Sequence, residues 1–232
     1  MKKHIPNIIT SCNLISGCIA TYWAFQGDYQ LALLFIVIGA AFDFCDGMSA
    51  RLLHVSSPIG KELDSLADDI TFGFAPSAII FSWLKAQFAV ADASLFTLQS
   101  LLPYLAFIMA AFSALRLAKF NLDERQAMGF IGLPTPANAL FWGSLIVGAG
   151  NWIATSQYYI YGMLALVFVF SYLLISEIPM FALKFKTWGW KGNEIKYIFV
   201  LSSAAILAIL GIAGIAVVIL WYIILSAFCC KH

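Results

Sequence analysis

The sequence predicts an all-α fold, a polytopic membrane helical bundle of about eight transmembrane helices that forms a single integral membrane domain over residues 1–232. Hydrophobic residues make up 62% of the chain and charged residues 11%, whereas a soluble domain has about 25% charged residues. The apolar residues fall in long runs, and a helix needs about 20 of them to cross a bilayer. These runs and their short connections leave no room for a separate soluble domain.

Most of the predicted helices have a recognisable start or end. Pro6 suits the first turn of a helix, and Gly27 and Asp28 form a tight turn after it. Ser57 followed by Pro58 is typical of a helix start, with Ser57 as the cap. The first six helices are expected at residues 5–25, 30–53, 58–84, 98–120, 136–153 and 158–181.

The last apolar run, residues 195–228, fits one helix or two. One straight helix would be about 50 Å long, too long for a single span without heavy tilt. Two helices that turn near Gly211 and Gly214 would have about 16 residues each, which is at the lower limit for a span. The length of this run is therefore compatible with either seven or eight transmembrane helices in the chain.

The basic residues indicate an orientation. With a cytoplasmic N-terminus and eight helices, Lys85 is the one residue among the 13 lysines and arginines that falls outside. Seven helices would move only Lys231 across the membrane. The net charge of +1 gives no indication of a nucleic-acid partner.

Four aspartates occur in two pairs at helical spacing. Asp43 and Asp46 are three residues apart and Asp64 and Asp68 four, so each pair lies on one face of its helix. The first pair ends an apolar run and the second opens another. An uncompensated acid there costs about 2.5–3.5 kcal/mol, and four would repel one another. Hard divalent cations, Mg²⁺ or Mn²⁺, bind carboxylate oxygen and would relieve both costs. A single aspartate would be equally well explained as a helix-end residue.

This stretch follows the pattern D-x2-D-G-x2-A-R-x8-G-x3-D-x3-D and resembles the signature of the CDP-alcohol phosphotransferases, integral membrane enzymes of phospholipid synthesis. The resemblance implies a six-helix core within residues 1–190, with additional C-terminal helices in residues 191–232. It also implies two metal ions on the four aspartates, a CDP-linked donor that releases CMP, and Asp68 as the general base. The signature positions are Asp43, Asp46, Gly47, Ala50, Arg51, Gly60, Asp64 and Asp68.

The resemblance further implies a CDP-diacylglycerol site beside the metals. Gly47 would let the nucleotide approach the helix backbone, and Arg51 would bind the phosphates. Gly47 and Gly60 equally fit helix packing, and Ser57 equally fits a helix cap. The residues expected to contact CDP-diacylglycerol are Asn7, Thr10, Gly47, Ala50, Arg51, Ser57 and Gly60.

Residues 114–121 and 130–138 resemble blocks of the bacterial and archaeal phosphatidylserine synthases, a subfamily, and so imply L-serine as the acceptor. The serine carboxylate requires a cation, for which Arg116 is expected, with Asn121 orienting the substrate and Lys119 in the same polar cluster. Glu177 is a second candidate, for the ammonium group. Arg116 and Lys119 equally fit basic anchors at the cytoplasmic surface.

Two other functions remain open on the sequence. A sibling enzyme would use glycerol 3-phosphate or an inositol phosphate, acceptors that favour several basic residues near the site. An ion-coupled transporter would also use intramembrane acids, but the repeated halves typical of such proteins are not found. The resemblance implies a homodimer, with the lipid tails entering from the bilayer. The short chain indicates a prokaryotic cytoplasmic membrane, and the distribution of basic residues places the site on the cytoplasmic side.

Overall fold

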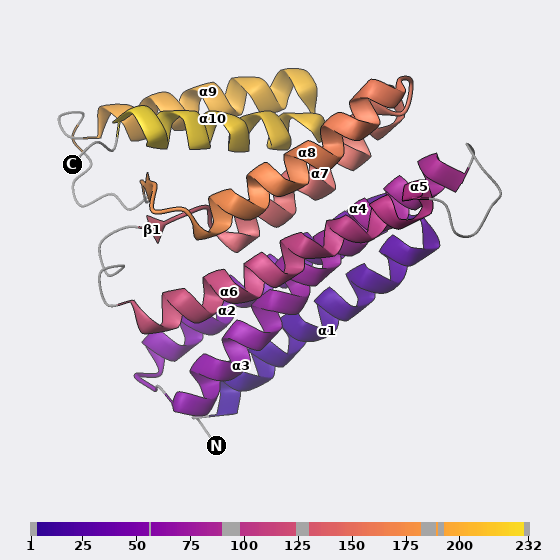
Figure 1. The fold of residues 1–232 in the computed structure, drawn as a ribbon. Helices are drawn as coiled ribbons and strands as arrows, with labels where there is room; N and C mark the ends of the chain where they lie inside the picture. The colour runs from indigo at the N-terminus through magenta and orange to yellow at the C-terminus, as the bar shows by residue number, and fades with distance from the viewer. Residues whose placement is uncertain are drawn as a thin grey trace.

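The computed structural model describes residues 4–55, 57–89, 98–123, 130–181, 189 and 193–229, and nearly all of them are helical (Figure 1). The elements of the N-terminal half are α1 (Ile5–Gln26), α2 (Tyr29–Leu52), α3 (Pro58–Asp68), the π-helix η2 (Asp69–Phe74), α4 (Ala75–Ala89), α5 (Leu98–Leu101), the 3₁₀-helix η3 (Leu102–Ala106) and α6 (Phe107–Leu122). Those of the C-terminal half are β1 (Phe130–Ile131), α7 (Thr135–Ile153), α8 (Gln157–Ile175), β2 (Pro179–Met180), α9 (Glu194–Leu210) and α10 (Ala213–Cys229).

The helices pack in a bundle in which neighbours along the chain are mostly neighbours in space. Helix α1 packs along α2 and also touches α3, η2 and α4. Helix α7 joins the two halves, because it contacts α2 and α4 on one side and α10 on the other. In Figure 1, α9 and α10 lie side by side over α7 and α8, away from α1 and α3. The N-terminal helices therefore form one group and the last two helices an added layer.

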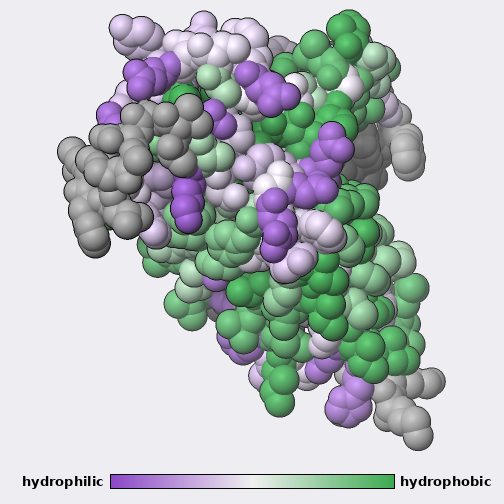
Figure 2. All heavy atoms as spheres, turned by 90° about the vertical axis from the view of Figure 1, so that its right-hand side faces the viewer, coloured by the Kyte–Doolittle hydropathy of each residue, from purple (hydrophilic) through white to green (hydrophobic). Residues whose placement is uncertain are grey.

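The surface of the bundle is suited to a bilayer. Figure 2 shows broad stretches of hydrophobic side chains on the outside of the molecule. Within the part of the chain that the structure describes, four helical segments are long and apolar enough to cross a membrane: Ile5–Gln26, Tyr29–Leu52, Gln99–Leu122 and Gln157–Ile175. An all-helical membrane bundle is thus confirmed, whereas eight crossings remain a prediction.

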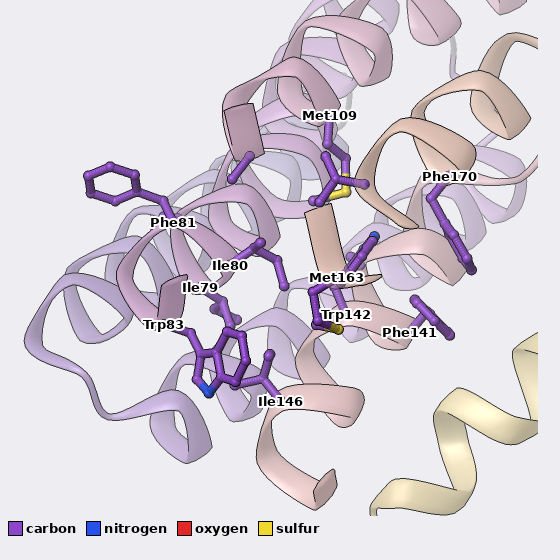
Figure 3. Packing of buried hydrophobic residues seen from close by; sticks show 14 of the residues in the cluster. Ile79, Ile80, Phe81, Trp83, Met109, Phe141, Trp142, Ile146, Met163 and Phe170 are labelled. Atoms are coloured by element: carbon purple, nitrogen blue, oxygen red, sulfur yellow. The ribbon is translucent and has the colours of Figure 1, made fainter. Parts of the chain in front are cut away.

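The core lies between α4, α6, α7 and α8 (Figure 3). Trp142 of α7 is fully buried, and the neighbouring Phe141 stacks on Phe170 of α8 with 4.0 Å between the ring centroids. Ile79 and Ile80 of α4 are also fully buried in this cluster. Aromatic stacking of this kind adds about 0.5–1.5 kcal/mol per pair to the burial term. The core fixes the helices whose other ends carry the polar site.

The predicted sixth helix was wrong at its C-terminal end, because α8 ends at Ile175 and not at residue 181. Ser176 is extended at φ −64° and ψ 153°. β2 then pairs antiparallel with β1, with Ile131 opposite Pro179. Gly132, at φ 76°, donates its N–H to the carbonyl of Ile178 at 3.0 Å. These pairings, between segments far apart in the sequence, compete with continuation of the helix, and Pro179 cannot donate the amide that continuation needs.

The last apolar run forms two helices, which was the second of the two alternatives that its length allowed. Helix α9 ends at Leu210, and Gly211 follows at φ 57°, a left-handed conformation that favours glycine. Gly214 lies inside α10, where an added Cβ would come within 3.0 Å of the carbonyl oxygen of Ile206. The turn therefore needs Gly211, and the close approach of the two helices needs Gly214.

Candidate active site

The aspartate pairs reach the same end of the bundle on two neighbouring helices. Asp43 and Asp46 lie in the last turns of α2. The next helix, α3, begins as predicted, because the Ser57 hydroxyl accepts the Gly60 N–H at 2.9 Å and Pro58 occupies the first turn. One and two turns later this helix carries Asp64 and then Asp68.

Three of the four aspartates meet closely. Asp43, Asp64 and Asp68 each offer one carboxylate oxygen, and these atoms all lie within 4.8 Å of one another. Oδ1 of Asp64 is buried and has no hydrogen-bond partner among the described residues. Such a set of carboxylate oxygens fits the oxygen coordination that Mg²⁺ and Mn²⁺ prefer, and a cation would give the orphaned oxygen a partner.

Asp46 lies outside that group of three. It is buried, with 6% of its surface exposed, and its Oδ2 accepts a 2.6 Å hydrogen bond from the Thr10 hydroxyl of α1. The four aspartates were expected to face one another. The structure instead brings three of their carboxylates close together, while Thr10 of α1 binds the fourth, Asp46. That all four ligate metal remains a prediction.

A cavity of about 260 Å³ opens between α1, α2 and α3 beside the carboxylates. We refer to it as the α2–α3 cavity. It brings together the residues expected to contact CDP-diacylglycerol except Arg51. It adds Lys61, which the sequence had indicated only as one of the basic residues expected on the cytoplasmic side. Its lining consists of Pro6, Asn7, Thr10, Asp46, Gly47, Ala50, Val55, Ser57, Gly60, Lys61 and Asp64.

The two signature glycines have different roles in this structure. A Cβ added to Gly47 would meet only one atom within 4 Å outside its own helix backbone, Nη2 of Arg51 at 4.0 Å. Gly47 therefore keeps cavity space open and does not serve helix packing. A Cβ on Gly60 would come within 3.0 Å of both the Asn7 and Ser57 side chains. Gly60 allows a close approach of α1 to α3, which is the packing alternative.

A second cavity of about 210 Å³ lies on the other side of the carboxylates. We refer to it as the α3–α6 cavity. It joins the aspartates to the end of α6 and the start of α7, and Asp64 lines both cavities. Its lining consists of Asp43, Asp64, Ser65, Asp68, Arg116, Leu117, Phe120, Asn121, Pro134, Thr135 and Pro136.

Besides Asp64, two side chains in the α3–α6 cavity have buried polar atoms with unused hydrogen-bonding capacity. Arg116 is 7% exposed, and its Nε has no partner among the described residues. Its guanidinium lies over the Phe120 ring, 5.2 Å from the centroid. The hydroxyl of Thr135 is fully buried and also lacks a described partner. A basic anchor at a membrane surface extends its charge into water, so the burial of Arg116 argues against that alternative.

Asn121 connects α6 to α3. Its side-chain amide donates to the Ser65 hydroxyl at 2.8 Å, and its backbone carbonyl accepts from Nζ of Lys61 at 2.9 Å. Lys119 and Glu177 instead line a small neighbouring cavity of about 50 Å³, in which Arg116 is the residue shared with the α3–α6 cavity. Neither Lys119 nor Glu177 lines the α3–α6 cavity itself.

Sequence reasoning missed Ser65 and Thr135 as cavity residues. Thr135 lies within the block 130–138 that had been noted as a whole, so its hydroxyl was an available signal. Ser65 follows Asp64 directly and had no signal of its own, because its place depends on how α6 crosses α3.

Known proteins resemble this chain over most of its length. The family model described as CDP-alcohol phosphatidyltransferase matches residues 3–182. A Bacillus subtilis protein named CDP-diacylglycerol–serine O-phosphatidyltransferase is 38% identical over 134 residues, which cover 58% of this chain and 70% of that protein. A protein of the same name from Methanocaldococcus jannaschii is 32% identical over 215 residues, 93% of this chain and 88% of the relative.

A third protein of that name, from Helicobacter pylori strain ATCC 700392 / 26695, is 33% identical over 140 residues, 58% of this chain. The alignment spans only about half of that relative, 54% of its length. The matched residues 3–182 contain both aspartate pairs and all the residues that line the two cavities. The chain belongs to the CDP-alcohol phosphatidyltransferase family.

Proposed function

We propose that the protein transfers the phosphatidyl group of CDP-diacylglycerol to the hydroxyl of L-serine and releases CMP. The observation that carries the proposal is the α3–α6 cavity, in which a buried, incompletely paired arginine faces the same space as three clustered carboxylates. An amino-acid acceptor needs a cation for its carboxylate and a base for its hydroxyl, and this cavity holds both. The names of the relatives support the same acceptor.

The donor would occupy the α2–α3 cavity. Gly47 and Ala50 leave room there for the cytidine and the diphosphate, and Arg51 stands beside Gly47, where its guanidinium would bind the phosphates. Lys61 also lines the cavity, but its ammonium donates to the Asn121 carbonyl of α6. Asp43, Asp46, Asp64 and Asp68 would hold two divalent cations, Mg²⁺ or Mn²⁺. When bound, the cations neutralise the diphosphate and stabilise the entering and leaving oxygens.

The acceptor would approach from the α3–α6 cavity. Arg116 would bind the serine carboxylate, with Asn121 and Lys119 contributing to the orientation. Asp68 would take the hydroxyl proton as the serine oxygen forms a bond to the phosphorus nearer the lipid. The bond from that phosphorus to the oxygen of the CMP phosphate breaks in line, and CMP leaves with the electron pair.

We further propose that the enzyme works as a homodimer with eight membrane crossings, in a prokaryotic cytoplasmic membrane. The site would face the cytoplasm, where cytidine nucleotides are present. The placement of lysines and arginines in the sequence supports this orientation, because Lys85 is the one basic residue expected on the outer side.

The test is CMP release from CDP-diacylglycerol by the purified protein in detergent. L-serine, glycerol 3-phosphate and an inositol phosphate are each supplied with Mg²⁺ or Mn²⁺, and Asp68→Asn is the control. We expect release with serine, and a loss of about 10²–10⁴-fold in the control. Release with one of the phosphorylated acceptors and not with serine would overturn the assignment of the α3–α6 cavity and retain the reaction type.

A further inference from the structure

Helix α1 sends one polar side chain to each aspartate pair. Thr10 donates to Oδ2 of Asp46 at 2.6 Å, and Nδ2 of Asn13 donates to Oδ1 of Asp68 at 3.1 Å. Thr10 and Asn13 are three residues apart and share one face of the helix. Asn13 is fully buried and lines neither cavity, so it is in a position to act on the aspartate and not on a substrate.

We propose that Asn13 is a positioning residue for Asp68. Its amide holds one carboxylate oxygen of Asp68, so that the other is directed to the cation and to the hydroxyl that gives up its proton. The inference rests on the proposed function for the proton step, and on the close approach of Asp68 to Asp43 and Asp64 for the cation. Hydrogen bonds to metal-ligating carboxylates generally fix their orientation in this way.

The surroundings hold Asn13 in place. The hydroxyl of Thr71 in η2 donates to the Asn13 carbonyl oxygen at 3.0 Å, which ties α1 to the turn directly after Asp68. Gly39 of α2 packs against both residues, since an added Cβ would come within 3.0 Å of Asn13 Oδ1 and 2.5 Å of Thr71 Cγ2. The Asn13 amide is therefore confined by its packing against Gly39 of α2, whereas the Thr71 hydroxyl binds only the backbone carbonyl of Asn13.

A purely structural role would not explain an amide at this position. Oδ1 of Asn13 is buried without a partner among the described residues, and leaving such a group unpaired costs about 1–3 kcal/mol. An apolar side chain of similar size would avoid this cost and could still fill the space between the helices. The amide is better explained by the donor that it presents to Asp68.

The test compares Asn13→Leu and Asn13→Asp with the matched control Thr71→Val. Both Asn13 variants keep the size of the side chain but remove the amide donor, whereas Thr71→Val removes the second link between the same segments without touching Asp68. Mn²⁺ binding by each purified protein, without substrates, is measured by electron paramagnetic resonance. The kcat and KM values for CMP release follow, and the unfolding midpoint checks the fold.

We expect both Asn13 variants to bind Mn²⁺ about 10–100-fold more weakly and to lose a similar factor in kcat, because this is the usual effect of removing a group that orients a metal ligand. The KM for CDP-diacylglycerol should change little, and Thr71→Val should behave as the wild type. If Asn13→Leu does not fold, Asn13→Ser, which is too short to reach Asp68, replaces it with the same expectation.

Wild-type Mn²⁺ affinity and kcat in the Asn13 variants would overturn the proposal. An equal loss in Thr71→Val would also overturn it, since packing between α1 and η2 would then explain both effects. The binding measurement separates this proposal from the proposed function. If the wild-type protein fails to release CMP with each of the three acceptors, the proposed function is wrong. The Mn²⁺ affinities of the variants still decide the role of Asn13 in that case.

Discussion

The two cavities that flank the carboxylates are built in different ways. The α2–α3 cavity is formed by the start of α1 and by a nearly continuous stretch from Asp46 to Asp64, and its lining includes the small residues Gly47, Ala50 and Gly60. The α3–α6 cavity takes its lining from the ends of α2 and α6, from α3 and from the start of α7, and it contains Arg116 and Phe120. One side of the site is open and local in sequence, and the other is assembled from distant segments.

This difference suggests a division of work. The proposed donor, a nucleotide diphosphate, is large and requires space beside the carboxylates, which the small residues provide. An acceptor is small and differs between enzymes, so its recognition requires specific charged and polar groups, which can change without altering the α2–α3 cavity. The comparison predicts that substitutions on the two sides affect different substrates.

Asp64 lines both cavities, so its replacement should disrupt both sides. In Asp64→Asn we expect kcat/KM for CMP release to fall about 10³-fold with any acceptor, because loss of a metal ligand removes several kcal/mol of charge stabilisation. Mn²⁺ binding measured without substrates should weaken in parallel. A variant that retained wild-type Mn²⁺ affinity and activity would show that Asp64 is not part of the metal centre.

Arg116→Ala should affect only the acceptor side. The KM for serine should rise about 10–100-fold, which corresponds to the roughly 1.5–3 kcal/mol of a hydrogen bond to a charged group. The KM for CDP-diacylglycerol should stay near the wild-type value. Steady-state kinetics with one substrate varied at a time measure both. An unchanged KM for serine would remove Arg116 from the acceptor site.

Gly47→Ala should have the smallest effect and should affect only the donor side. The added methyl group has room to fit, so the fold is preserved, but it occupies space in the α2–α3 cavity. We expect a threefold to tenfold rise in the KM for CDP-diacylglycerol, about 1 kcal/mol, with the KM for serine unchanged.

The matched control for Gly47→Ala is Gly162→Ala on α8. A Cβ at Gly162 also has room to fit, since it would meet nothing within 4 Å, but this glycine is exposed and lines none of the cavities described above. The control should behave as the wild type with both substrates. A KM for CDP-diacylglycerol that rises equally in the two variants would place the effect outside the α2–α3 cavity.

The sequence indicated the α2–α3 cavity well because its residues follow local rules. Ser57 and Pro58 start a helix wherever the chain goes next, and Asp64 and Asp68 fall on one face of that helix at any packing angle. The prediction that Gly60 could serve packing, and that Gly47 could leave space for a ligand, also followed from residue type. Which alternative applied to each glycine depended on neighbouring helices, and spacing could not decide it.

The composition of the α3–α6 cavity could be predicted only in part from the sequence. Arg116 and Asn121 were expected near the metals, but the inclusion of Thr135 and the displacement of Lys119 depend on how α6 and α7 meet α3. The predicted C-terminal end of the sixth helix, at residue 181, was wrong for a related reason. The strand pairing of Ile131 with Pro179 joins segments far apart in sequence, and helix propensity does not register such contacts.

The sequence by itself determined the membrane class, the helical architecture and the pairing of the aspartates on single helix faces, because hydrophobicity and helical spacing are properties of neighbouring residues. Tertiary structure alone decided that Asp43 joins Asp64 and Asp68 while Asp46 turns to Thr10, and that Asn13 reaches Asp68. The physical reason is that these contacts depend on the distance and crossing of α1, α2 and α3, which are fixed by close packing between helices and not by any one of them.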